Sequence, residues 1–300
     1  MKNNFSHIGL AKLCGWFGLT RQAYYQNGWK CIDMSIEEEI ILKEVQSIRQ
    51  NHKRMGTRKL YEKLYPFMLE HQIKMGRDSL FDLLSAHHLL VRKRKRRIQT
   101  TQSFHWLRKY PNFIRGFVPA APNQLWVSDI TYWKINNNNH VYISFITDTF
   151  SHKIVGYHVA ESLESIETIQ ALKMALSDLG SESHFQLIHH SDRGVQYCHH
   201  DYVKLLQDYD IKISMTENGD PRENAIAERV NGILKDEWLN QMKLESLDHA
   251  IEELKRIIKI YNCCRPHASL DMKTPEYVHS QSGEFKKRWK TYYNTTITAV

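Results

Sequence analysis

The chain has 300 residues, with 41 Lys and Arg against 33 Asp and Glu, for a formal net charge of +8. Apolar residues make up 42% and aromatic residues 11%, which excludes a disordered, collagen-like or coiled-coil rod protein. No apolar run approaches the roughly 18 residues of a membrane span, and the first residues lack a signal peptide, so we expect no membrane contact. Five scattered cysteines without paired zinc spacing favour free thiols in a reducing compartment.

Positive charge is concentrated at the N-terminal end of the chain. Residues 1–100 hold 19 Lys and Arg against 9 Asp and Glu, whereas the remaining residues hold 22 against 24. The densest run contains six consecutive cations, which are Arg92, Lys93, Arg94, Lys95, Arg96 and Arg97. Such a run is typical of nucleic-acid binding, and a solvated linker is the alternative. We therefore expect a DNA-binding part joined to a second domain.

The first hundred residues have the pattern of short helices. A helix over 10–15, a turn, and Thr20 as the N-cap of a helix over 21–26 resemble a helix-turn-helix, with a plain helical hairpin as the alternative. Ser35 and Glu38 form a capping box that predicts a separate helix start. We assign 1–97 to an all-helical, helix-turn-helix-like DNA-binding region and 98–122 to a basic, proline-containing connector.

From residue 123 the pattern changes to alternating strands and helices. Strands are expected at 125–133, 141–147, 153–159, 185–190 and 211–215, and helices at 166–179, 201–209, 225–241 and 246–261. This order predicts an α/β fold, a mixed sheet flanked by helices that begins with an antiparallel meander. We place this second domain at 123–285, with a C-terminal tail at 286–300.

Three acidic residues stand where a core would not need them. Asp129 lies inside the first strand, Asp192 directly follows the fourth, and Glu228 lies opposite the apolar stripe of its helix. We place Asn224, Asn231 and Lys235 on the same helix face as Glu228. Any one of these acids alone would be read as a solvated carboxylate, but together they indicate a site.

Clustered carboxylates need cations to remain together. Two like charges 4 Å apart repel by about 4 kcal/mol at an effective dielectric constant of 20. Ligation by oxygen atoms alone favours Mg²⁺ or Mn²⁺ over zinc. Paired ions of this kind serve phosphodiester displacement, which suits a partner domain that binds DNA.

The sequence resembles the transposases of bacterial insertion sequences that carry a retroviral-integrase-type core. It is most similar to the second-reading-frame (OrfB-type) product of the third insertion-sequence family. The matching segments are 123–132, 190–197, 215–218, 223–228 with Lys235, 261–267 and 274–275. Between Asp192 and Glu228 lie 35 residues (228 − 192 − 1), which is the Asp-Asp-35-Glu spacing of that family.

The resemblance implies a ribonuclease-H-like fold, magnesium, and DNA cleavage and joining at the ends of the element. By position, Asp129, Asp192 and Glu228 are the implied catalytic residues and metal ligands, and Lys235 is an implied contact to element-end DNA. Arg193 either shapes the loop after Asp192 or contacts DNA. Glu223 departs from the aspartate expected before Asn224, and the zinc-binding unit of retroviral integrases is absent from the sequence.

The mechanistic hypothesis uses two Mg²⁺ ions, for which Mn²⁺ is an expected substitute. Asp129 bridges both ions, Asp192 holds one and Glu228 the other. Water cleaves at the element end, and the resulting 3′-hydroxyl attacks a second phosphodiester, without a covalent protein intermediate.

The resemblance also implies partners and a location. The partners are the terminal inverted repeats of the element and target DNA, with a homo-oligomer on DNA. A helix-turn-helix protein from an upstream reading frame is a further partner, either separate or as a frameshift fusion. The expected location is the bacterial cytoplasm, associated with the nucleoid. The alternatives are a DNA-binding regulator with an inert core and a ribonuclease-H-like nuclease or resolvase.

Overall fold

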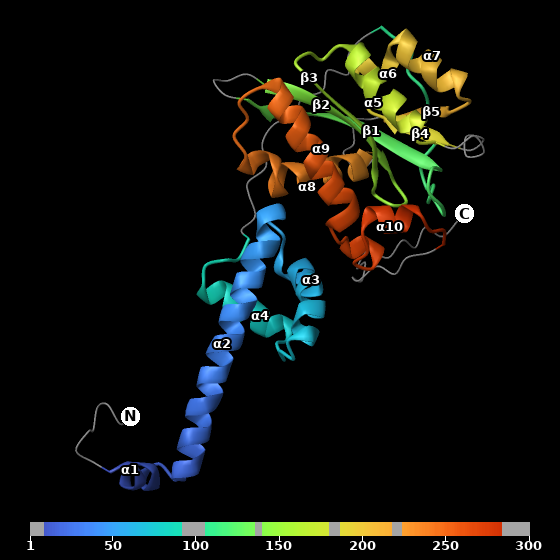
Figure 1. The fold of residues 1–300 in the computed structure, drawn as a ribbon. Coiled ribbons are helices and arrows are strands. Elements are labelled where there is room, and N and C mark those ends of the chain that lie inside the picture. The colour runs from blue at the N-terminus through green and yellow to red at the C-terminus, as the bar shows by residue number, and fades with distance from the viewer. Residues whose placement is uncertain (1–8, 92–105, 136–139, 180–186, 218–223, 284–300) are drawn as a thin grey trace. The chain divides into compact units, whose positions relative to one another are not determined.

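The computed structural model describes residues 9–91, 106–135, 140–179, 187–217 and 224–283 (Figure 1). The basic run 92–97 lies outside these residues. The chain divides into an N-terminal unit, Met1–Asn51 with Met55–Val91, and a core unit, His52–Arg54 with Arg92–Val300. No helix among the described residues is both long and apolar enough to cross a membrane.

The N-terminal unit is helical, as predicted. Its helices are α1 (Leu10–Trp16), α2 (Arg21–Asn51), α3 (Thr57–Glu70) and α4 (Arg77–Ala86). The hydroxyl of Thr20 accepts a hydrogen bond from the backbone N–H of Ala23 at 3.0 Å, which confirms the predicted N-cap. Aliphatic side chains of α2, α3 and α4 form one small core, which includes Ile41, Val45, Leu60, Leu64, Leu80 and Leu84.

The second predicted helix start in this unit is wrong. Helix α2 continues from Arg21 to Asn51, so it neither ends at Gln26 nor begins again near Ser35. The only helix-breaking residue between these points is Gly28, because the stretch contains no proline. A single glycine costs a helix about 1 kcal/mol relative to alanine, which weakens the helix without ending it.

The core unit is built on one mixed five-stranded sheet. Its strands are β1 (Leu125–Lys134), β2 (His140–Asp148), β3 (Ile154–Ala160), β4 (Ile188–Ser191) and β5 (Lys212–Met215). The order across the sheet is β3-β2-β1-β4-β5. Strands β1, β2 and β3 pair antiparallel, whereas β4 is parallel to both β1 and β5. The predicted meander and mixed sheet are thus confirmed, and the topology is ribonuclease-H-like.

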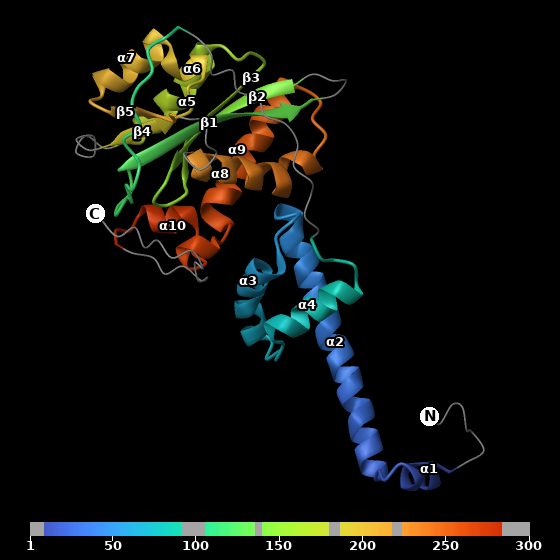
Figure 2. The same cartoon turned by 180° about the vertical axis from the view of Figure 1, so that it is seen from behind.

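Helices cover both faces of this sheet (Figures 1 and 2). One face packs against α5 (Ser165–Ser177), α6 (Val195–Cys198) and α7 (His200–Asp208). The other packs against α8 (Ala225–Glu237) and α9 (Leu247–Cys264). On the first face, Gly156 of β3 allows the close approach of α5, because a Cβ there would lie 2.2 Å from the carbonyl oxygen of Ala171. Two apolar cores therefore hold the central strands rigid from both sides.

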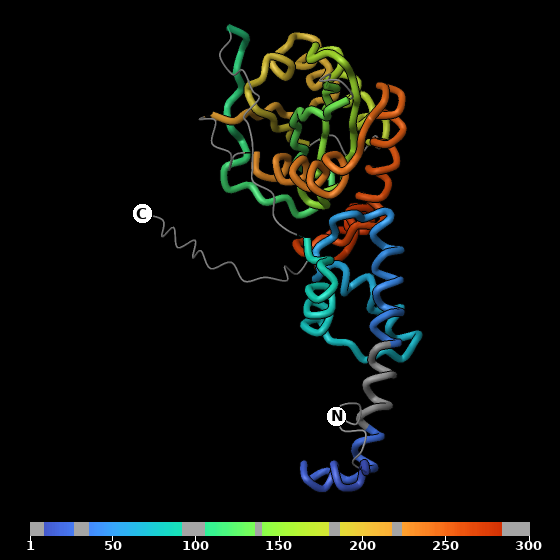
Figure 3. Tube along the Cα trace, turned by 90° about the vertical axis from the view of Figure 1, so that its left-hand side faces the viewer, coloured from blue at the N-terminus to red at the C-terminus, as the bar shows by residue number. Residues whose placement is uncertain are grey.

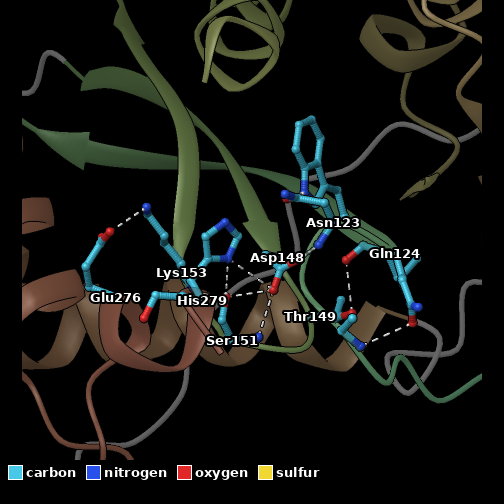
Figure 4. A network of polar contacts seen from close by, with 12 residues as sticks. Asn123, Gln124, Asp148, Thr149, Ser151, Lys153, Glu276 and His279 are labelled. Atoms are coloured by element: carbon cyan, nitrogen blue, oxygen red, sulfur yellow. Dashed lines mark hydrogen bonds and ion pairs between the residues drawn. The ribbon is translucent and has the colours of Figure 1, made fainter. Parts of the chain in front are cut away.

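A buried polar network joins the start of β1 to the C-terminal helix α10 (Pro275–His279) (Figure 4). The fully buried carboxylate of Asp148 accepts hydrogen bonds from the backbone N–H of Asn123 at 2.8 Å and from the hydroxyl of Ser151 at 2.6 Å. His279 of α10 lies 2.9 Å from the same hydroxyl. The hydroxyl of Ser151 therefore has a structural role. The network holds the turn between β2 and β3 against helix α10.

Candidate active site

Asp129 lies near the middle of β1, the central strand of the sheet. Side chains alternate between the two faces along a strand, so Asp129 shares a face with Trp133, which packs among α8 and α9. Its carboxylate is half-buried and accepts a hydrogen bond from the backbone N–H of Ile130 at 2.9 Å. The strand thus presents one acid toward helix α8.

Helix α8 is joined to β1 at this acid by two asparagines. The side-chain amide of Asn231 donates to Oδ2 of Asp129 at 2.6 Å. The amide of Asn224, just before the helix, donates to the backbone carbonyl of Ser128 at 3.1 Å. Both asparagines are 7% exposed. These two bonds set the position of the first turn of α8, which carries Glu228, against the strand.

The predicted helix face needs a correction. Glu228 is exposed, as expected, but Asn224 and Asn231 are buried and Lys235 is half-buried. Asn231 lies four residues after Ala227 and three before Leu234, both of which are buried. It therefore belongs to the border of the buried stripe, where it can reach Asp129.

Asp192 follows β4 at the edge where that strand ends. Its Oδ1 accepts a hydrogen bond from the backbone N–H of Gly194 at 2.9 Å. A Cβ on Gly194 would lie 2.9 Å from the same oxygen, too close for any other residue in this conformation. The predicted tight loop after Asp192 is therefore present, and it orients the carboxylate through the backbone.

The charges of the other two predicted acids act on Asp129. The pKa of its carboxyl is raised to about 7, by burial first and then by the charges of Asp192 and, less strongly, Glu228, against hydrogen bonds from Asn231 and Ile130. Asp129 therefore lies within electrostatic range of both Asp192 and Glu228. A carboxyl group with this pKa is only partly ionised at neutral pH. Without a bound cation, the site therefore does not carry its full negative charge.

The donor set fits a divalent cation that binds oxygen. Across the described ranges, no three His, Cys, Asp or Glu side chains lie together in a group that could hold a metal ion as they stand. The buried amide oxygens of Asn224 and Asn231 have no hydrogen-bond partner, and the amide of Asn231 contacts Asp129. Carboxylate and amide oxygens are ligands, or partners of bound water, for Mg²⁺ and similar ions.

Lys235, the predicted DNA contact, belongs to the same neighbourhood. Its ammonium lies 4.2 Å from the centre of the Tyr132 ring. Burial lowers the pKa of this ammonium, whereas the charge of Asp129 raises it. Arg193 follows Asp192 in the loop and is half-buried. The predicted contacts at 92–97 lie outside the described residues.

Sequence reasoning missed the closest partner of Asp129. The sequence pattern places Asn231 on the exposed face with Glu228. Its spacing of three residues puts it one helical turn from Glu228, which was a signal that the two side chains could act at the same site. Tyr197 of α6 was also missed. Burial raises the pKa of its phenol well above its usual value, and the charges of Tyr202, Asp192 and Asp129 add to this shift. Tyr197 closes the matching segment 190–197, but its spacing assigned it no role, because α6 has only four residues.

The sheet order, the flanking helices and the three neighbouring acids define an integrase-type catalytic core. Two models of the integrase core domain match the chain, one over residues 119–221 and the other over 209–275. A 31 kDa protein of insertion element IS600 from Shigella sonnei, described as uncharacterized, is 34% identical over 271 residues, covering 88% of this chain and 96% of that protein.

A second relative carries a functional name. The transposase for insertion sequence element IS629, also from Shigella sonnei, is 32% identical over 69% of this chain and 70% of its own length. Among solved structures, the HTLV-2 integrase catalytic core domain in complex with magnesium has a TM-score of 0.42 and 25% identity, over 53% of this chain and 97% of that chain. The chain belongs to the insertion-sequence transposases with an integrase core domain, a family of polynucleotidyl transferase enzymes.

Proposed function

We propose that this transposase cleaves DNA at the ends of its insertion sequence and joins the freed 3′ ends to a target. Asp129, Asp192 and Glu228 are its catalytic carboxylates. The observation that carries the proposal is the position of Asp129 on the central strand, where the charges of Asp192, at the end of β4, and Glu228, on α8, both act on its carboxyl group. A carboxyl group held next to two further acids gains no structural benefit without a cation.

Mg²⁺ is the proposed cofactor, as two ions held by Asp129, Asp192 and Glu228, with Mn²⁺ as a substitute. When bound, such ions supply Lewis-acid polarisation of the phosphodiester. The chain supplies the positioning. Asn231 fixes Oδ2 of Asp129, and the N–H of Gly194 fixes Oδ1 of Asp192. The buried oxygen of the Asn231 amide has no partner in the structure, so it can accept a hydrogen bond from a water held by a bound ion.

The reaction consists of two displacements at phosphorus. In cleavage, water adds to phosphorus and the bond to the 3′ oxygen breaks, leaving a 3′-hydroxyl and a 5′-phosphate. In strand transfer, that 3′ oxygen attacks a target phosphorus, the target's own 3′ oxygen leaves, and the proton passes to solvent. No nucleophilic side chain is required, because the three acids only hold the metal ions and orient the reacting groups.

DNA contacts are proposed for Lys235, Arg193 and the run 92–97. The ammonium of Lys235 lies beside Asp129 and the ring of Tyr132, so a phosphate placed at the acids would lie within its reach. The N-terminal unit and the basic run are proposed to bind the terminal inverted repeats. Because transposition brings two ends together, we also propose a homo-oligomer on DNA, and an upstream-frame partner or frameshift fusion remains part of the proposal.

The test uses purified full chain and a linear DNA that carries both terminal inverted repeats of its element. With Mg²⁺, we expect a nick at the repeat boundary and then a joined product with a second DNA. A DNA-binding regulator would shift the DNA in a gel without cutting it. A nuclease or resolvase would cut it without forming the joined product. Either of these outcomes would overturn the proposal.

A further inference from the structure

The connector before β1 exposes a large aromatic side chain. Trp106 is 92% exposed, whereas a tryptophan usually buries most of its surface. Its neighbours Leu107 and Tyr110 pack against the apolar core beneath α5, α6 and α7. The segment 106–110 is therefore anchored through its inner side chains, and the indole ring of Trp106 stands out from an ordered backbone.

Cations accompany this ring. The guanidinium of Arg108 lies 5.2 Å from the centre of the Tyr110 ring, and Lys109 is exposed. Residues 106–124 contain three Lys and Arg and no Asp or Glu. The third cation, Arg115, is engaged with Glu217 at 2.7 Å. Arg108 and Lys109 thus give the surface around Trp106 its positive charge.

The connector, whose backbone trace is drawn in Figure 3, is bonded to β5, the edge strand next to β4. The carbonyl of Pro111 accepts from the N–H of Met215 in β5 at 3.3 Å. The N–H of Phe113 donates to the hydroxyl of Ser214 at 2.9 Å, and that hydroxyl also contacts Nδ1 of His190 in β4 at 2.9 Å. His190 lies on β4, two residues before Asp192, so the connector is bonded to β5 and Ser214 of β5 links it to the strand that leads to Asp192.

The charges that act on Cys198 agree with a connector that lies near Asp192. The thiol of Cys198 in α6 lies 3.6 Å from the sulfur of Met215. The pKa of this thiol is raised to about 11, by burial first and then by the charge of Asp192, while the charges of Lys109 and Arg193 oppose the shift. Lys109 of the connector and Asp192 of the active site therefore both lie close to one thiol.

We propose that Trp106 stacks on an unpaired base of the DNA strand held at the active site, with Arg108 and Lys109 against its phosphates. This inference rests on the proposed function. An exposed indole flanked by cations matches a nucleotide, which offers a flat ring next to a negative charge. A duplex would offer only phosphates, because its bases are already stacked.

Fluorescence tests the proposal without catalysis. The probes are a 15-nucleotide oligo-dT with one central 2-aminopurine and the matching 15-base-pair duplex, both in EDTA. We expect Trp106→Ala to weaken single-strand binding about tenfold and to abolish quenching of 2-aminopurine, with less than a twofold effect on the duplex. Trp106→Phe keeps most of the binding. The matched control is Val118→Ala, because Val118 is 82% exposed on the same connector.

Charge and assembly provide the remaining outcomes. Arg108→Ala with Lys109→Ala weakens binding to both probes and lowers the salt slope by roughly 1.5, as expected for two lost phosphate contacts. Unchanged single-strand affinity in Trp106→Ala overturns the proposal, as does an equal loss on both probes. An altered sedimentation coefficient without DNA, with DNA affinity intact, assigns the ring to contact between copies and also overturns it.

Failure of this inference differs from failure of the proposed function. If Trp106→Ala binds normally in EDTA while the wild type cleaves and joins DNA with Mg²⁺, only the stacking is wrong. If the tenfold loss is seen and the wild type never cleaves, stacking stands and the catalytic proposal is wrong.

Discussion

The side-chain amide of Asn231 donates to Oδ2 of Asp129 across 2.6 Å, joining helix α8 to the central strand of the sheet. Asn231 follows Glu228 by one helical turn, so this single bond relates two of the three acids in space. It also leaves the opposite oxygen of the amide buried without a hydrogen-bond partner, beside the proposed cation site. The geometry of the three acids therefore depends on a residue that carries no charge.

Replacing that amide is expected to impair catalysis more than folding. Asn231→Ala should lower the cleavage rate by about 10- to 100-fold and raise the Mg²⁺ concentration needed for half-maximal rate, as losses of groups that orient metal ligands commonly do. The measurement is the cleavage rate against Mg²⁺ concentration. Asn240→Ala is the control, because Asn240 is exposed. An unchanged Mg²⁺ dependence in Asn231→Ala would contradict the assigned role.

The raised pKa of Asp129 predicts a pH-dependent stability. The folded-state pKa of about 7 exceeds the ordinary value of 3.8, so the folded protein binds more protons than the unfolded one between these values. Stability of the metal-free protein should therefore fall as pH rises from about 4 to 7. Asp129→Asn removes the pH-dependent contribution of this carboxyl group to stability. The melting temperature of the variant should therefore exceed that of the wild type by a margin that grows from about pH 4 to 7 and is constant above about pH 7.

The measurement is thermal unfolding of both proteins in EDTA from pH 4 to 8, followed by addition of Mg²⁺. Mg²⁺ should raise the melting temperature of the wild type more at pH 8 than at pH 5, because only the ionised carboxylate binds it. A margin between the two proteins that does not change with pH would contradict the assigned pKa.

The loop after Asp192 should tolerate no side chain at Gly194. In Gly194→Ala the new Cβ would lie 2.9 Å from Oδ1 of Asp192, so the carboxylate or the loop must move. We expect at least a tenfold loss of cleavage with the fold retained, checked by cleavage rate and circular dichroism. Gly232→Ala in α8 is the control, because its Cβ would meet nothing within 4 Å, and alanine there should stabilise the helix by about 0.5–1 kcal/mol. Equal activity in the two variants would refute this account of the loop.

A buried ion pair should support the helix that carries Glu228. Arg265 is 1% exposed and donates to Glu237, at the end of α8, through Nη2 at 2.6 Å and Nε at 2.9 Å. Arg265→Met leaves the glutamate charge buried and unpaired, so we expect a loss of about 3–5 kcal/mol in the free energy of unfolding. Denaturant unfolding measures it. The half-exposed pair of Arg256 and Glu253 is the control, and Arg256→Met should cost less than about 1 kcal/mol. Similar losses at the two pairs would show that burial does not set this energy.

Much of the core could be predicted because its strands alternate apolar and polar residues between clear turns. The first strand was expected at 125–133 and spans Leu125–Lys134. The three acids could be proposed as a site because each occupies a place that packing does not require. Helix α6 was missed because Val195–Cys198 is too short to show a helical period. The bond from Asn231 to Asp129 joins residues 102 positions apart, and such a contact is set by packing that local patterns do not encode.

The most direct test of the account is the Mg²⁺-dependent cleavage rate of Asp129→Asn, Asp192→Asn, Glu228→Gln and the double variant of Asp129→Asn with Glu228→Gln. Asp201→Asn serves as an exposed-acid control. When residues act as one catalytic unit, removing any one of them removes the function of all. The cleavage rate of each single variant should therefore fall by about 10³-fold or more, and that of the double variant should fall no further. Cleavage within tenfold of the wild type in any of the three single variants would contradict the claim that these acids form one catalytic site.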